Sequence, residues 1–243
     1  MHRLGFTMRN RDNFTDIRLT INTLDVFHFR SKILKTLQSA IPKFRGDFLD
    51  VGCGKKPYMP LIVQNPNLGK YIGLDLQNAR DYGGAKADIF WTAEGKIPLS
   101  NESVQSAMAT EVLEHCPDPV AILKEVNRVL APGSFFFLTV PFIWNLHEVP
   151  FDEYRYTPFS LKRMLHDTGF EIVETKAHGG WNAALGLVLA LWCRRYWKNN
   201  LLKFAFSICL FPLIYLLFKS DNQPVEFSEG QMITGISILA KKL

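Results

Sequence analysis

Cysteine is scarce in this chain of 243 residues, and its four cysteines are scattered, with no close pair at metal-ligand spacing (Cys53, Cys116, Cys193 and Cys209). A disulfide framework needs dense cysteines in a small secreted chain, and a structural zinc site needs them in close pairs. The sequence therefore predicts neither feature, and no other metal-binding cluster is evident along the chain. A reducing, cytoplasmic setting fits this cysteine usage best.

An apolar leader is also missing. Residues 1–30 mix charged and polar side chains with isolated apolar ones, so they contain no run long enough for a signal peptide. We therefore expect a cytoplasmic protein that begins with a loosely ordered basic segment. The formal net charge is +5, but the excess sits in one stretch without acids, residues 183–220, which contains Arg194, Arg195, Lys198, Lys203 and Lys219. These residues are interleaved with apolar runs, so nucleic acid is not expected as a partner.

A third absence concerns glycine. The apolar residues 48–51 suit a buried parallel strand, and Gly52 and Gly54 after it let the backbone approach a ligand closely. A dinucleotide site would place a third glycine three residues later, where this chain has Pro57. The turn therefore fits a nucleotide cofactor without a pyrophosphate.

Two acids follow the glycine turn. Residues 71–76 are typical of a second short strand ending in Asp75, at the distance downstream where one strand-helix-strand unit places a ribose-binding carboxylate. Residues 86–90 favour a short third strand that carries Asp88. For Asp88 an acid in a surface turn is the alternative interpretation.

These segments, together with two later ones, resemble the class I S-adenosylmethionine-dependent methyltransferases, most of all the group often labelled methyltransferase type 11 (residues 48–54, 71–76, 87–89, 111–115 and 132–134). The resemblance covers residues 45–178 and the last strand. It implies an α/β fold with a Rossmann-like, seven-stranded, mostly parallel sheet and helices on both faces. It also implies S-adenosylmethionine as cofactor, with cofactor-binding residues at Asp50, Gly52, Cys53, Gly54, Asp75, Leu76, Asp88, Ile89 and Glu111. Asp88 would bond the adenine amino group, and residues 111–115 would line the sulfur end.

The remaining elements follow from periodicity and from helix punctuation. We expect helices over residues 24–41, 57–64, 119–130 and 158–168, and further strands over residues 104–110, 134–140, 170–177 and 232–240. The first helix would cap the sheet or the cofactor pocket, and residues 78–84 would form a loop. This divides the chain into a lead and cap helix (1–45), a methyltransferase core (46–178 and 231–243) and an insertion (179–230).

The loop over residues 141–157 is the predicted substrate site. It follows a central strand, where open α/β sheets bind ligands, and it is similar to a run found in the type 11 group, with substrate candidates Trp144, Tyr154, Arg155 and Tyr156. Arg155 would orient an anionic substrate through paired hydrogen bonds, or else pair with Glu148 or Glu153.

Three residues are candidates for catalysis: His147, Asp152 and His115. An imidazole titrates near pH 6.5, so His147 can accept a proton at neutral pH and is the leading candidate base. The alternative for His147 is a loop histidine hydrogen-bonded to Asp152 or to backbone. For His115 the alternative is structural packing near the cofactor.

The insertion contains two apolar runs, residues 183–193 and 204–218, joined by a basic and aromatic patch. Each run is shorter than the roughly 20 apolar residues of a membrane-spanning helix. An interfacial hairpin fits better, with apolar side chains in the bilayer and basic and tryptophan side chains at the headgroups. An internal helical lid and a homodimer face are the alternatives.

These features predict a methyltransferase that acts on a small or amphiphilic acceptor, such as a lipid-linked saccharide, by O-methylation, peripheral on the inner face of a membrane. One alternative is a non-catalytic, membrane-associated module that only binds the cofactor. Another is a nicotinamide-dependent reductase, against which Pro57 argues.

Overall fold

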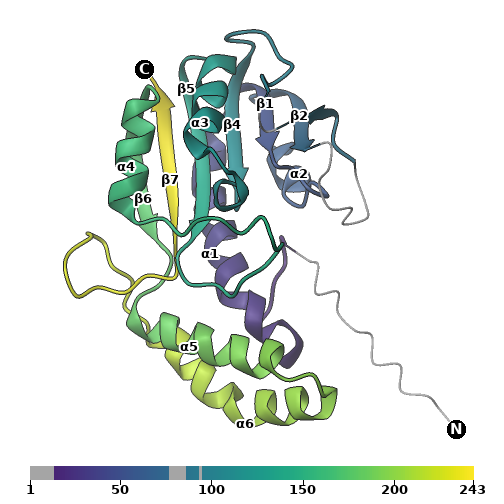
Figure 1. Cartoon of the computed structure of the whole chain (residues 1–243), viewed down its shortest axis with the longest axis vertical. Helices are drawn as coiled ribbons and strands as arrows, with labels where there is room; N and C mark the ends of the chain where they lie inside the picture. The colour runs from purple at the N-terminus through teal and green to yellow at the C-terminus, as the bar shows by residue number, and fades with distance from the viewer. Residues whose placement is uncertain (1–13, 77–85, 93–94) are drawn as a thin grey trace, which may run out of the picture.

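The computed structural model describes residues 14–76, 86–92 and 95–243. It contains a seven-stranded sheet of order β3-β2-β1-β4-β5-β7-β6 (Figure 1). The strands are β1 (Gly46–Val51), β2 (Leu68–Leu76), β3 (Ile89–Trp91), β4 (Val104–Thr110), β5 (Leu130–Pro141), β6 (Phe170–Ala177) and β7 (Gly235–Lys242). Among these strands only β7 runs antiparallel to its neighbours, β5 and β6. The predicted mostly parallel, Rossmann-like fold is confirmed.

Helices cover both faces of the sheet. They are α1 (Leu24–Ala40), α2 (Met59–Ile62), α3 (Pro119–Val129), α4 (Pro158–Asp167), α5 (Trp181–Leu191) and α6 (Asn200–Lys219), with short turns η1 (Ile21–Thr23), η2 (Ile41–Lys43) and η3 (Leu113–His115) and the π-helical η4 (Trp192–Tyr196). The core on one face includes Leu123 of α3 and Leu161 of α4, and the core on the other includes Leu37 of α1. Phe136 and Phe137 of β5 enter opposite cores, as expected of a strand buried on both faces.

Helix boundaries agree with their sequence signals. The Asp118 carboxylate accepts from the Ala121 backbone N–H at 2.9 Å and caps α3, and Thr157 caps α4 in the same way just before Pro158. Gly169 ends α4 with a left-handed backbone, φ +83°.

Several boundaries differ from prediction, and β3 begins only at Ile89, so Asp88 precedes the strand that was expected to carry it. The first crossover helix is only the single turn α2, because its exit loop is tied down through Asn65 to the backbone carbonyl of Phe44. Strand β5 begins at Leu130, directly after α3, because Leu130 pairs with Val104 ahead of a register shift. Strand β7 runs from Gly235 to Lys242, three residues later than expected at its start. The predicted loop at residues 78–84 lies within a stretch outside the described residues.

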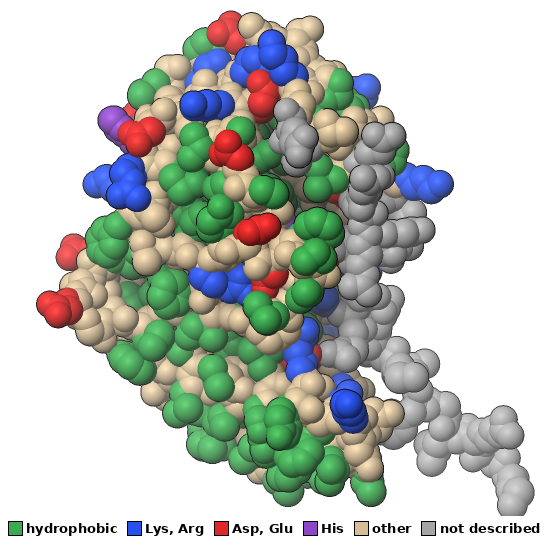
Figure 2. Space-filling model, in the orientation of Figure 1, with side chains coloured by type: hydrophobic (Ala, Val, Ile, Leu, Met, Phe, Trp, Pro, Cys, Tyr) green, Lys and Arg blue, Asp and Glu red, His purple; other side chains and the backbone are tan. Residues whose placement is uncertain are grey.

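The insertion folds into a helical hairpin of α5, η4 and α6, below the sheet in Figure 1. A small apolar cluster of Ala190, Cys193 and Ile214 packs it against Leu24 at the start of α1. By length and composition α6 is apolar enough to cross a membrane, and only a small part of it is buried. Figure 2 shows the resulting apolar patch over the hairpin.

Candidate functional site

The predicted site residues lie at one edge of the sheet, where β1, β2, β4 and β5 end. Because these strands are parallel neighbours, their carboxyl ends meet at that edge. The glycine turn follows β1, Asp75 lies near the end of β2, and Glu111 follows β4 directly. The loop after β5 completes the edge.

The glycine turn has the backbone that its sequence predicts. Gly52 and Gly54 both lie in the left-handed region, with φ of +66° and +49°. A Cβ added to Gly52 would lie 2.5 Å from Cγ2 of Val112, so this position has room for backbone only. The turn is anchored by the Cys53 N–H, which donates to the Leu74 carbonyl at 3.0 Å. Burial raises the pKa of the Cys53 thiol to about 12, so it stays protonated and unreactive.

Asp75 connects the ends of two strands. Its Oδ2 accepts from the Gly54 N–H at 2.9 Å, and its Oδ1 accepts from the Leu76 N–H at 2.8 Å. The carboxylate therefore lies directly beside the glycine turn, as a ribose-binding acid must. Side chains of Leu76 and Ile89 are half-buried against the main core.

Asp88 has a partner that sequence reasoning missed. Lys56 is buried, and its Nζ lies 2.8 Å from Asp88 Oδ2, which also accepts from the Gly73 N–H at 2.7 Å. Although desolvation raises the pKa of Asp88, the bonds from Lys56 and Gly73 outweigh it and lower the pKa overall. A Cβ on Gly73 would lie 2.5 Å from Lys56 Cε, which explains the glycine there. In the sequence, the only indication of this ion pair was a lysine two residues after the glycine turn.

Asp50 is buried inside β1 and accepts a hydrogen bond from the Tyr71 hydroxyl. Burial raises its pKa to about 7, although the Tyr71 bond acts in the opposite direction. Asp50 therefore supports the strand beneath the glycine turn.

Glu111 and Glu114 form a buried carboxylate pair. The Glu111 Oε1 accepts from Thr139 Oγ1 at 2.6 Å, whereas Oε2 of Glu111 and both carboxylate oxygens of Glu114 have no hydrogen-bond donor among the described residues. Burial raises the pKa of Glu111 to about 8, and burial together with the charge of Glu111 raises that of Glu114 well above its ordinary value. Such a pair needs a proton or a cation.

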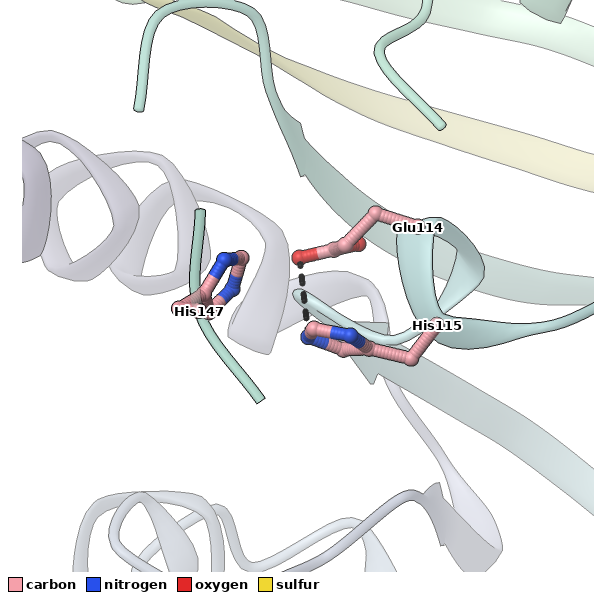
Figure 3. Close-up of side chains that lie close together, drawn as sticks. All are labelled: Glu114, His115 and His147. Atoms are coloured by element: carbon pink, nitrogen blue, oxygen red, sulfur yellow. Dashed lines mark ion pairs between the residues drawn. The ribbon is translucent and has the colours of Figure 1, made fainter. Parts of the chain in front are cut away.

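Two histidines meet beside this pair. The rings of His115 and His147 lie 4.7 Å apart between centroids, and His115 Nε2 lies 3.8 Å from Glu114 Oε1 (Figure 3). His115 Nδ1 lies 3.0 Å from the Phe151 carbonyl. Burial lowers the pKa of both histidines, so both are neutral at pH 7.

An aspartate and an arginine support the second histidine. Asp152 Oδ2 lies 3.2 Å from His147 Nδ1, and Arg155 holds the same carboxylate through two bonds of 2.7 and 2.9 Å. The Arg155 guanidinium lowers the pKa of Asp152 well below its ordinary range. The partner of Arg155 is thus Asp152, not Glu148 or Glu153 as the alternative supposed. The contact expected between His147 and Asp152 is present.

The aromatic residues of the loop differ in their positions. Tyr156 is buried and donates to the Leu113 carbonyl at 2.7 Å, so it anchors the loop. The prediction that Tyr156 contacts the substrate is therefore wrong, because its side chain is closed off from solvent. Tyr154 is partly exposed and donates to the Pro117 carbonyl at 3.1 Å. Trp144 stacks on Phe29 of α1, with ring centroids 4.8 Å apart.

The spacing of residues along the chain predicted no metal site. The fold nevertheless brings one ligand atom each from Glu114, His115 and His147 within 4.8 Å of one another. Sequence spacing does not reveal this cluster, because His147 belongs to a different loop.

Comparisons with known proteins agree with this arrangement. A family model described as a methyltransferase domain matches residues 25–175. An uncharacterized methyltransferase of Mycobacterium sp. (strain KMS) is 27% identical over 174 residues, which cover 62% of this chain and 68% of the relative. A malonyl-[acyl-carrier protein] O-methyltransferase of Alcanivorax borkumensis is 30% identical over 109 residues, or 42% of this chain and 37% of the relative.

The fold is also shared with solved structures. A SAM-dependent methyltransferase from Archaeoglobus fulgidus has a TM-score of 0.53 and 19% identity, and the match covers 87% of this chain and 94% of that one. The left-handed glycine turn and the adjacent Asp75 fit a nucleoside cofactor, and the family match favours methyl transfer over hydride transfer. The chain therefore belongs to the methyltransferase domain family of class I S-adenosylmethionine-dependent methyltransferases, with S-adenosylmethionine as its cofactor.

Proposed function

We propose that this methyltransferase transfers a methyl group to a hydroxyl oxygen of an amphiphilic acceptor, such as a lipid-linked saccharide, while it is docked on a membrane surface. The observation that carries the proposal is direct contact between the acceptor loop, residues 141–157, and the helical hairpin of α5, η4 and α6. The Arg195 guanidinium lies 5.0 Å above the ring of Trp144. Arg195 Nε also lies 3.0 Å from Asp25 Oδ2 at the start of α1. An acceptor held at the hairpin surface would therefore lie beside the loop that contains Trp144 and His147.

The surface of the hairpin suits a lipid interface. Large apolar side chains are exposed along both helices and η4: Trp181, Leu185, Val188, Trp192, Tyr196, Leu201, Phe204, Ile208, Leu213, Tyr215 and Leu216. Basic residues without acidic ones accompany them between residues 183 and 220. This combination is typical of segments that lie in the headgroup region of anionic membranes.

The packing of α6 favours lying on the membrane over crossing it. Ile214 is fully buried against Leu24 and Cys193, and Phe218 stacks on His28 at 5.0 Å. Crossing the bilayer would break these contacts with α1. One side of α6 packs against the rest of the protein and its other side is apolar. We therefore expect only the outer side of α6 to enter the bilayer.

The residues at the sheet edge then have separate tasks. Bound S-adenosylmethionine supplies a methyl group on a positively charged sulfur, so that transfer forms a C–O bond, breaks the C–S bond and releases the hydroxyl proton. Asp75 and the glycine turn hold the nucleoside end. The hydroxyl proton would pass to the imidazole of His147, with that of His115 beside it, and both rings are neutral at pH 7. Arg155 and Asp152 orient His147.

The acceptor class is tested with S-adenosylmethionine carrying a ¹³C-labelled methyl group. The purified enzyme is incubated separately with the lipid extract and with the aqueous metabolite extract of the source cells. We expect label in the lipid extract, with the ¹³C chemical shift of a methyl ether. Label found only in the aqueous extract, or a shift typical of methyl on nitrogen or carbon, would contradict the proposal.

Membrane docking is tested by co-sedimentation with phosphatidylcholine vesicles, with and without phosphatidylglycerol. We expect binding that increases with the anionic lipid and is lost in Leu201→Glu and Leu216→Glu. The matched control is Phe159→Glu, which also charges an exposed apolar side chain but lies on α4, away from the hairpin. A dimer in sedimentation that L201E dissociates, with no vesicle binding, would instead identify the hairpin as a homodimer interface.

A further inference from the structure

We infer that Glu114, His115 and His147, with Glu111 beside them, form a binding site for a divalent transition-metal ion. The first observation is their convergence. Glu114 and His115 belong to η3 after β4, and His147 comes from the loop after β5, yet their ligand atoms lie within 4.8 Å of one another (Figure 3). Glu114 is fully buried, and both histidines are only partly exposed.

The second observation is a set of unpaired carboxylate oxygens. Both oxygens of Glu114 and the Oε2 of Glu111 are buried, and among the described residues each carboxyl group has only the other as a further hydrogen-bond partner, which requires one of the two to be protonated. Native proteins pair nearly all such atoms, because an unpaired buried carboxylate is strongly destabilising. A cation between Glu114 and the histidines would satisfy these atoms.

The third observation is the orientation of the two imidazoles. The Phe151 carbonyl can only accept, so the proton of neutral His115 lies on Nδ1, and Nε2 carries the lone pair that faces Glu114. His147 Nδ1 lies 3.2 Å from the Asp152 carboxylate, within ion-pair distance but without hydrogen-bond geometry, and the neutral ring keeps one nitrogen lone pair for the ion. A carboxylate or carbonyl behind each ligating histidine is the usual outer support of metal sites.

The balance of charge favours a divalent ion. Three carboxylates lie together at this point, from Glu111, Glu114 and Asp152, and one guanidinium, that of Arg155, lies near them. A divalent cation would neutralise the remaining charge. Mixed imidazole and carboxylate ligands suit Mn²⁺ or Zn²⁺ better than Mg²⁺ or Ca²⁺, which prefer oxygen alone.

Three protein ligands would leave coordination positions open for an acceptor group. In this role, which rests on the proposed function, the ion would bind the acceptor hydroxyl and lower its pKa. His147 would then be a ligand, and the ion, not the imidazole, would assist loss of the proton. Asp152 and Arg155 would be positioning residues.

The site is tested by calorimetric titration of the chelator-treated full-length protein with MnCl₂, ZnCl₂ and MgCl₂, without any acceptor. We expect Mn²⁺ or Zn²⁺ to bind one ion per chain more tightly than Mg²⁺. Glu114→Gln and His147→Gln should abolish this binding, and Asp152→Asn should weaken it about 10- to 100-fold. The matched control is His166→Gln, an exposed histidine on α4, which should bind the ion like the wild type.

Two further measurements make the result decisive. Nitrogen couplings in the pulsed electron paramagnetic resonance spectrum of Mn²⁺ bound to the wild type should show that imidazole ligates the ion. Titration with S-adenosylmethionine shows that each variant is still folded. No ion binding by the wild type, or equal binding by wild type and E114Q, would overturn the inference and leave Glu111 and Glu114 sharing a proton. Ion binding without methylation of lipid would refute only the proposed acceptor.

Discussion

Two buried histidines should make the protein sensitive to mild acid. His28 Nε2 lies 3.0 Å from Thr234 Oγ1, and His178 Nε2 lies 2.5 Å from Ser237 Oγ. Burial lowers the pKa of His28 to about 4 and that of His178 to about 3. The positive charge of Lys32 also lowers the pKa of both histidines. The negative charge of Asp221 raises the pKa of His28 and so acts against burial. A charge on His28 lowers the pKa of His178 further.

The sign and size of the effect follow from linkage. In the unfolded chain each histidine titrates near pH 6.5, while in the folded protein it remains neutral down to its lowered pKa. Stability is therefore complete above pH 6.5 and falls as the pH drops below it, because only the unfolded state takes up the protons. At pH 5 each histidine should reduce the free energy of unfolding by about 2 kcal/mol.

Urea unfolding at pH 7 and pH 5 measures this loss. His178→Gln keeps an amide nitrogen able to bond Ser237, and it should lose about 2 kcal/mol less than the wild type between the two pH values. Other groups titrate alike in both proteins, so the difference isolates His178. His166→Gln, at an exposed position, should behave like the wild type. An equal loss in H178Q and the wild type would refute the reasoning, and His28→Gln provides an independent repeat.

Further predictions concern the cofactor turn and the core. Asp75→Asn removes the charge from the hydrogen bond to Gly54 and from the proposed ribose contact, so calorimetry should show S-adenosylmethionine binding about 10- to 100-fold weaker. Gly52→Ala places a Cβ on a left-handed backbone, which costs about 1–2 kcal/mol, and brings that Cβ against Val112. The affinity for S-adenosylmethionine should fall at least about 5-fold, and it should recover in part when Val112→Ala is added. Leu165→Ala, in the main core, should lower the free energy of unfolding by about 2–5 kcal/mol, as measured by urea titration. A loss below about 1 kcal/mol would instead show that neighbouring side chains move to fill the space left by Leu165.

Most of the fold was predictable, because its signals are local. Alternating or continuous apolar runs predicted the strands, and helix punctuation predicted the starts of α3 and α4. The glycine turn was predictable because only glycine tolerates the backbone and the close approach of Val112 found at Gly52. Boundaries such as the start of β5 were missed because Leu130 pairs with a strand far away in sequence.

The site itself was only partly predictable. The sequence placed Asp75, Glu111 and the loop after β5 at one sheet edge, because parallel strands end together. Contacts between separate turns depend on how the sheet orders its strands, and no local pattern encodes them. The tertiary structure therefore decided that Lys56 pairs with Asp88, that Tyr156 is buried, and that His147 meets Glu114 and His115. By itself the sequence determined the fold and the nucleoside-binding turn; the packing of β4 beside β5 decided which side chains face one another at the centre of the site.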